Sequence, residues 1–224
     1  MESRRRFLVV GATALGGLLA RSAFATAPAP APAEGVTPNE DLMREHGVLR
    51  RLLLVYEEVG RRAAGARPSR AALAEAAGMI RHFVEDYHEK LEEDYIFPAF
   101  EKTNRLADLT AILRAQHQAG RSITAQLEAL AERREGESTN ARLRTLLAQF
   151  VRMYRPHAAR EDTVLFPAFP GLVGHGRYDE LGDLFEDRER QLFGENGFER
   201  MVAQVQGIEQ QLGIYRLEEF TPRS

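Results

Sequence analysis

The sequence predicts an all-α protein, an antiparallel up-down four-helix bundle with additional C-terminal helices. Three observations support this prediction. Apolar residues recur with helical spacing, and no stretch alternates apolar and polar residues as a half-buried strand does. Four long periodic segments are joined by short connections, as in up-down bundles. Finally, residues 87–101 return as residues 156–170 with nearly the same sequence, which indicates two similar halves.

The first two helices follow from their capping and breaking residues. Residues 37–40 (TPNE) predict a helix start, with threonine as the N-cap, proline at the first helical position and glutamate three residues after the cap. We expect this helix to run to a break at 60–68. The second helix is expected from about residue 69 to Phe97. It should end at Pro98, because proline inside a helix removes a backbone hydrogen bond.

Two more long helices are expected at 106–133 and 140–166, separated by a break at 136–138. The fourth helix should end at its Phe-Pro in the same way as the second. A Gly-rich loop then leads to helices at 178–193 and 198–212. We expect these last helices to pack outside the bundle as a cover, and they are the candidate surface for a homodimer.

The N-terminal residues are typical of a twin-arginine signal peptide. Arg4 and Arg5 lie in the twin-arginine box, a short apolar run follows, and residues 23–25 (AFA) supply small residues for cleavage. We therefore expect a periplasmic protein without a stable membrane span; anchoring by an uncleaved N-terminus is the alternative. The chain divides into a signal peptide (1–25), a Pro/Ala linker (26–36), the bundle (37–170) and a C-terminal helical extension (171–224).

The composition of the chain excludes several kinds of functional site and of partner. The chain has no cysteine, which excludes disulfides, thiolate metal sites and thiol catalysis. Of its 30 basic and 33 acidic residues, the first 25 positions carry four and one, so the remainder has 26 basic and 32 acidic residues. Because this balance is acidic, we do not expect nucleic acid as a partner.

The repeated stretch carries the pattern His-x-x-x-Glu at residues 88–92 and again at 157–161. A spacing of four places the imidazole and the carboxylate on one face of a helix. Each copy follows a helix that contains one histidine, at position 46 or 117. Four imidazoles and two carboxylates from four helices can therefore converge on a two-metal site. The predicted ligands are His46, His88, Glu92, His117, His157 and Glu161.

The symmetry of the halves predicts how the ligands are shared. One ion is expected between the first two histidines and a second between the other two, with both glutamates bridging. His-x-x-x-Glu alone occurs by chance in many helices, so the alternative is a bundle that serves only as an interaction module. Two copies followed by the same Phe-Pro-Ala-Phe favour the metal site. Nitrogen and oxygen ligands suit iron, manganese or zinc.

Over residues 38–170 the sequence resembles the hemerythrin-like (HHE cation-binding) domain. The matching motifs are EH at 45–46, HEKLEEDYIFPAF at 88–100, QH at 116–117 and HAAREDTVLFPAF at 157–169. The resemblance implies a non-haem di-iron centre that binds dioxygen. Two iron ions are therefore the expected cofactors, with manganese or zinc as alternatives, and dioxygen or a related small ligand is the expected partner.

The sequence departs from oxygen-carrying hemerythrins in two places. They have a fifth histidine one turn from the histidine of the third helix, where this chain has Leu113 and Arg121. Their last motif has aspartate five residues after histidine, whereas the pattern here is His157 with glutamate at four. An open metal position, filled by Glu89 or water, favours reduction of oxygen or peroxide over reversible carriage. A carrier or sensor of oxygen or nitric oxide and an iron-storage protein are the alternatives.

Other polar residues receive lesser roles. His82 lies about 120° around its helix from the predicted ligand and is expected to support the site or face solvent. We expect His175 in a solvated loop, and Glu93 and Asp94 on a solvated helix face. Tyr154 is expected to pack in the core, with a hydroxyl within reach of a bound ligand.

Overall fold

Helices account for all regular secondary structure in the part of the chain that the structure describes. The computed structural model describes residues 36–65, 69–133 and 136–222, and no strand occurs among them. The predicted signal peptide and all but the last residue of the linker lie outside these ranges. Among the helices that are described, none combines the length and the apolar character needed to cross a membrane.

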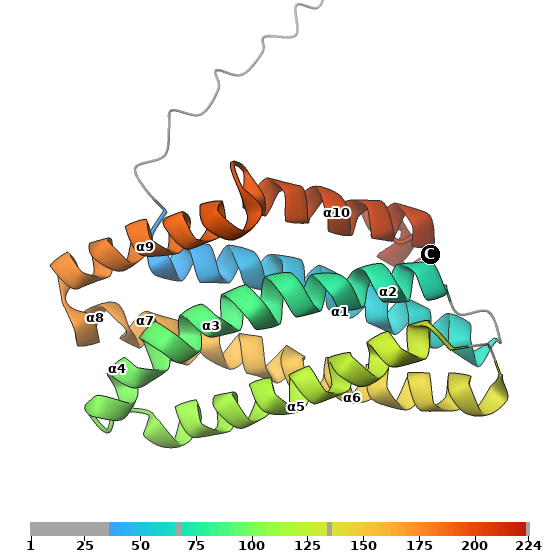
Figure 1. The fold of residues 1–224 in the computed structure, drawn as a ribbon, viewed down its shortest axis with the longest axis horizontal. Helices are drawn as coiled ribbons and strands as arrows, with labels where there is room; N and C mark the ends of the chain where they lie inside the picture. The colour runs from blue at the N-terminus through green and yellow to red at the C-terminus, as the bar shows by residue number, and fades with distance from the viewer. Residues whose placement is uncertain (1–35, 66–68, 134–135, 223–224) are drawn as a thin grey trace, which may run out of the picture. The chain divides into compact units, whose positions relative to one another are not determined.

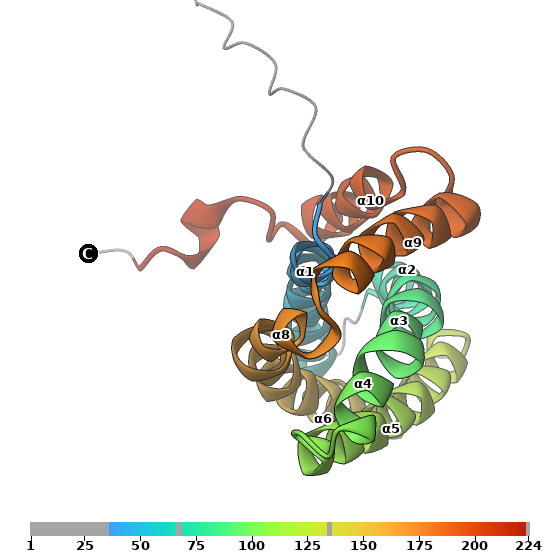
Figure 2. The same ribbon diagram turned by 90° about the vertical axis from the view of Figure 1, so that its left-hand side faces the viewer.

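Four long helices form the bundle. α1 (Pro38–Ala64) contacts both α2 (Arg70–Met79) and α6 (Glu137–Arg160), and α5 (Ala107–Ala131) contacts the same two. The helices therefore close a ring around one core, as Figures 1 and 2 show from the side and along the bundle. This arrangement confirms the predicted all-α four-helix architecture.

The first helix begins where the sequence predicts and ends later. Glu40 N–H donates to Thr37 Oγ1 at 3.3 Å and Thr37 N–H donates to Glu40 Oε2 at 3.1 Å, which completes the capping box. The helix continues through Gly60 to Ala64, so the predicted break begins five residues too early. Ala63 is buried on the core face, and this packing outweighs the weak helix propensity of the glycine.

Neither Phe-Pro ends its helix, so that prediction was wrong. After α2 the second long helix continues through η1 (Ile80–His88), α3 (Glu89–Leu91), η2 (Glu92–Ile96) and α4 (Phe97–Lys102). After α6 the fourth continues through η3 (Glu161–Leu165) into α7 (Phe166–Ala168). The η segments are π-helical, with hydrogen bonds five residues back. Pro98 and Pro167 are each the second residue of the α-helical turn that follows such a segment, where a missing N–H is tolerated.

The C-terminal extension packs on one side of the bundle. α8 (Pro170–Val173) leads into α9 (His175–Phe193), which contacts α1, and α10 (Gly197–Leu212) contacts α1 and α2. Figure 2 shows both long segments outside the ring of four. These helices cover one side of the bundle, as the sequence predicts. Their buried side chains are those of Leu181, Phe185, Val205, Ile208 and Leu212.

Candidate metal centre

All six predicted metal-binding residues lie together inside the bundle. Each is at most 4% exposed, although every one carries a polar or charged group. They come from all four helices: His46 from α1, His88 and Glu92 from the second long helix, His117 from α5, and His157 and Glu161 from the fourth. Burying this many polar groups at one point costs free energy of folding unless they form hydrogen bonds, ion pairs or bonds to a metal ion.

Each glutamate spans the two histidine pairs. Glu92 Oε1 lies 3.5 Å from Nε2 of His88, and its Oε2 lies 3.4 Å from Nε2 of His117. Glu161 Oε2 lies 3.4 Å from Nε2 of His46 and 3.1 Å from Nε2 of His157. Two ligands on one metal ion with bonds of ~2.0–2.2 Å are about 3.0–3.5 Å apart, so these spacings suit shared metal ions.

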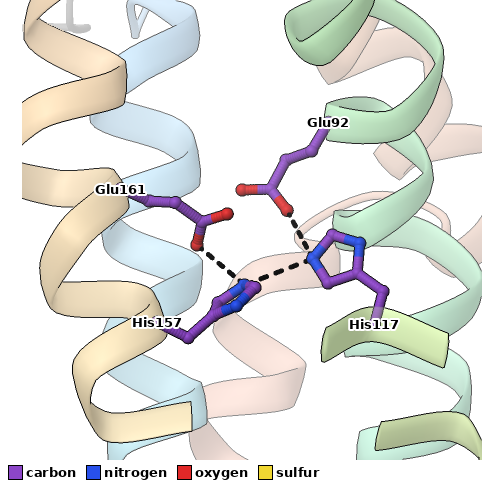
Figure 3. Close-up of side chains that lie close together, drawn as sticks. All are labelled: Glu92, His117, His157 and Glu161. Carbon is purple, nitrogen blue, oxygen red and sulfur yellow. Dashed lines mark hydrogen bonds and ion pairs between the residues drawn. The ribbon is translucent and has the colours of Figure 1, made fainter. Parts of the chain in front are cut away.

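The potential ligand atoms form two adjoining groups. Those of Glu92, His117, His157 and Glu161 all lie within 4.8 Å of one another, and Figure 3 shows these four side chains turned toward a common point. Those of His46, His88 and Glu92 also lie within 4.8 Å of one another. Because Glu92 belongs to both groups, the arrangement has the form of two neighbouring cation positions with a shared carboxylate.

Each histidine is oriented by an oxygen acceptor on the outer side of its ring. The four contacts from Nδ1 are His46 to Asp162 Oδ1 at 2.7 Å, His88 to Glu45 Oε2 at 2.6 Å, His117 to Glu93 Oε1 at 3.1 Å and His157 to Gln116 Oε1 at 2.8 Å. An ionised carboxylate or an amide oxygen only accepts hydrogen bonds, so Nδ1 donates. A neutral ring that donates from Nδ1 presents an unprotonated Nε2 to the centre, the usual arrangement of metal-binding histidines.

The histidine Nε2 atoms and glutamate oxygens that point into the centre are better suited to bind a metal ion than to form hydrogen bonds with one another. Nε2 of His117 and Nε2 of His157 face each other at 3.2 Å. In neutral rings that donate from Nδ1, both atoms carry lone pairs, which repel without a cation between them. Both oxygens of Glu92 and of Glu161 are buried and make no hydrogen bond to the described residues. Buried polar groups are normally satisfied, so these atoms indicate a cation site.

Two of the orienting acids had no such role in the sequence interpretation. Glu93 was expected on a solvated face, but its side chain is 11% exposed and it also pairs with Arg121 Nη2 at 2.8 Å. That prediction was wrong. Asp162 lies five residues after His157, at the spacing of the aspartate in oxygen carriers, so the expected departure in the last motif was wrong. Its carboxylate contacts His46 Nδ1 and also pairs with Arg50. Both acids orient histidines on other helices, so spacing within one helix does not reveal them.

The π-helical segments border the centre. His88 ends η1, Glu92 begins η2 and Glu161 begins η3. A π turn accommodates an extra residue and so rotates the following side chains relative to a regular α-helix. Within η3, neighbouring acids face different ways: Glu161 lies in the centre while Asp162 binds the outer nitrogen of His46.

Burial and mutual charge shift the pKa values of the group. Burial, together with the charges of Glu161 and Glu89, raises the pKa of Glu92 well above its usual range. Burial lowers the pKa of His117 to about 4. Burial alone would lower the pKa of His46, but its hydrogen bond with Asp162 and the negative charge of Glu161 outweigh that effect and raise the pKa to about 9. The metal-free site thus balances its charge with protons that a divalent cation would displace.

Glu89 lies beside the centre with its oxygens turned elsewhere. Tyr154 Oη donates to Glu89 Oε1 at 2.6 Å, and Arg121 Nη2 lies 2.8 Å from Glu89 Oε2. The approach of Glu89 to His117 is 3.9 Å, on the Nδ1 side. Gly120 makes room for this arrangement, since a Cβ there would lie 2.0 Å from the Tyr154 hydroxyl. Sequence spacing gave no sign of the role of Gly120.

The remaining candidates lie apart from the centre. The His82 side chain is 75% exposed and lies 3.4 Å from Asp86, so its surface assignment is confirmed. Asp94 is exposed, as expected. His175 is exposed too, but it begins α9 and does not lie in a loop.

Comparisons with known proteins agree with this geometry. The model of the family described as the hemerythrin HHE cation binding domain matches residues 37–169. Uncharacterized proteins of Mycobacterium tuberculosis and Mycobacterium bovis are each 44% identical over 233 residues, covering 98% of this chain and 91% of the relative. These matches extend beyond the family domain into the C-terminal helices. No solved structure matches the chain significantly.

The family match covers the four bundle helices and every residue of the two groups described above. It accounts for buried histidines and glutamates that would otherwise lack partners. The chain therefore belongs to the hemerythrin HHE cation-binding domain family, whose domain binds metal cations.

Proposed function

We propose that the chain is a non-haem di-iron protein that reacts with dioxygen or a related small oxidant. The observation that carries this proposal is the convergence of four Nε2 atoms and two carboxylates at a buried point. The ligands in each position would be two histidines and bridging glutamate. This mixture of imidazole and carboxylate suits iron, and also admits manganese or zinc.

The chain's own residues hold and shield the site. Bound iron would supply electrons and an open position for the oxidant. The ring of Phe166 stacks on His46 with centroids 5.5 Å apart, and Phe97 stacks on His117 at 5.4 Å. Leu113, where oxygen carriers have a histidine, is 1% exposed. These apolar neighbours keep water from the ligands, while the absent histidine favours reduction over carriage.

A proton source lies next to the site. The Tyr154 ring is 5.3 Å from that of His157, and its hydroxyl binds Glu89. Burial raises the pKa of Glu89 to about 8, so this carboxyl holds a proton at neutral pH. Tyr154 and Glu89 therefore form a buried hydrogen-bonded pair that can donate a proton toward the oxidant.

Reaction of the reduced protein with dioxygen tests this function. We expect it to consume reductant, and its visible spectrum should not return to the reduced form when oxygen is removed. Tyr154→Phe should keep its metal but slow turnover by about 10-fold or more, because the proton source is lost. Tyr95→Phe is the matched control, since Tyr95 packs against Phe185 instead, with centroids 5.9 Å apart. Full recovery of the reduced spectrum over repeated cycles would indicate a carrier or sensor.

We also propose that the mature protein acts in the periplasm after export by the twin-arginine route. The support is the sequence around Arg4 and Arg5 and the cleavage motif that follows. Replacing both arginines by lysine should trap a longer precursor in the cytoplasm, measured by fractionation and mass spectrometry. Unchanged export of that variant would contradict the proposal.

A further inference from the structure

A second group of carboxylates lies outside the metal centre, where α1 meets α9. Asp41, Glu45 and Glu189 each offer an oxygen within 4.8 Å of the others. Asp41 is 5% exposed and Glu45 is 1% exposed. Asp41 Oδ2 and Glu45 Oε1 make no hydrogen bond to the described residues. Buried acids at this separation repel one another unless a cation or protons lie among them.

A buried hydroxyl from a third element lies near the same acids. Tyr87, in η1, is 1% exposed, and its oxygen makes no hydrogen bond within the described ranges. Burial and the charges of Glu45 and Asp41 raise the pKa of Tyr87, as expected for a hydroxyl near these acids. Buried tyrosine hydroxyls normally find a partner, so this oxygen indicates a missing ligand and not merely an acidic surface.

The nearby basic groups do not neutralise this group of acids. Arg44 Nη1 lies 3.9 Å from Asp41 Oδ1, and the guanidinium lies over the Phe198 ring, 4.2 Å from its centroid. A pocket of about 290 Å³ opens over the carboxylates. Five carboxylates and two guanidinium groups line it, which leaves an excess of negative charge: Asp41, Glu186, Glu189, Glu195 and Glu199 against Arg44 and Arg190. Such a pocket attracts small cations.

We propose that Asp41, Glu45 and Glu189 bind one divalent cation, with Ca²⁺ the best fit. The oxygens are the ligands that hard cations prefer. Ca²⁺ takes about six to eight oxygens in a flexible geometry, whereas Mg²⁺ demands a near-ideal octahedron. Three carboxylates from two helices, two of them buried, therefore suit Ca²⁺ better. Water from the pocket completes the coordination.

This ion would join the C-terminal helices to the bundle. Glu189 lies in α9, beyond the matched family domain, and its Oε1 accepts a hydrogen bond from the backbone N–H of Phe198 in α10 at 2.8 Å. Glu45 accepts from Nδ1 of His88 with its other oxygen at 2.6 Å. One carboxylate that binds the ion, that of Glu45, would thus also orient a histidine of the metal centre. Another, that of Glu189, would also accept a hydrogen bond from the start of α10.

Calcium titration of the full chain by isothermal calorimetry tests the proposal. Calcium ions disfavour imidazole nitrogen, so they report on the carboxylates and not on the histidines of the metal centre. We expect one site per chain with a Kd of about 10⁻⁵ to 10⁻³ M, and a higher unfolding temperature with calcium. Asp41→Asn and Glu189→Gln should each weaken binding at least about 10-fold.

The variants are chosen to separate ligation from folding. Glu189→Gln keeps an amide oxygen for the Phe198 N–H, and Asp41→Asn removes a buried charge at constant size. Without calcium both variants should unfold at or above the temperature of the parent chain. Glu186→Gln removes a charge from the same pocket without removing one of the three ligands, so its calcium affinity should stay within about 2-fold.

Two results would overturn this site: no calcium binding by the folded parent chain, or equal binding by the Asp41→Asn/Glu189→Gln double variant. The titration is independent of the proposed di-iron function. A chain that purified without iron would refute that function and still give a readable calcium result, and the converse also holds.

Discussion

Replacing His157 by alanine should lower the affinity of the metal centre for at least one ion by more than about 100-fold. His157 faces both Glu161, at 3.1 Å, and His117, at 3.2 Å, so its loss opens one cation position directly. The other three histidines cannot take the place of His157, because hydrogen bonds from their Nδ1 atoms to acids on neighbouring helices fix the orientation of each ring. Metal content by mass spectrometry and competitive chelator titration would measure the effect.

Two further variants make the result specific. His82→Ala removes an exposed histidine of the bundle and should leave metal content unchanged. Asp162→Asn removes the charge that orients His46 and should weaken binding by an intermediate amount, about 10- to 100-fold. If His157→Ala and His82→Ala retained equal metal, His157 would not be a ligand.

Glu92→Gln should change the stability of the metal-free and the metal-loaded protein in opposite directions. In the metal-free state Glu92 is 0% exposed and lies beside the charge of Glu161, so a neutral amide is tolerated or stabilising. In the loaded state the same change removes a bridging ligand. At a metal concentration 100 times the Kd, binding stabilises a one-site protein by about 2.7 kcal/mol, and the variant should lose most of this gain.

Thermal unfolding with and without metal would measure this reversal. Glu75→Gln is the matched control: Glu75 is exposed on α2, and its replacement should leave both unfolding temperatures unchanged. An equal metal-induced rise in unfolding temperature for the parent chain and for Glu92→Gln would show that Glu92 does not bridge.

The histidines and glutamates of the centre were predictable because they repeat. His-x-x-x-Glu places both groups on one helix face whatever the details of packing, and two copies on a four-helix frame predict convergence. The start of α1 was equally accessible, since capping is local chemistry. Such features depend on residues within one turn of each other.

What the sequence did not reveal depends on contacts between helices or on irregular turns. Glu93 contacts His117 across 24 residues of chain, and Asp162 contacts His46 across 116. The prolines did not end their helices because π-helical segments precede them, and helical periodicity does not predict such segments. Gly120 is explained only by the Tyr154 hydroxyl that lies over it.

The iron content of the folded full-length chain after anaerobic reconstitution tests the central claim most directly. We predict about two iron ions per chain, and fewer in His157→Ala and Glu92→Gln, with the helical content of all three unchanged. A folded chain that binds no iron, manganese or zinc would contradict the account. The same conclusion would follow if both variants kept the metal content of the parent.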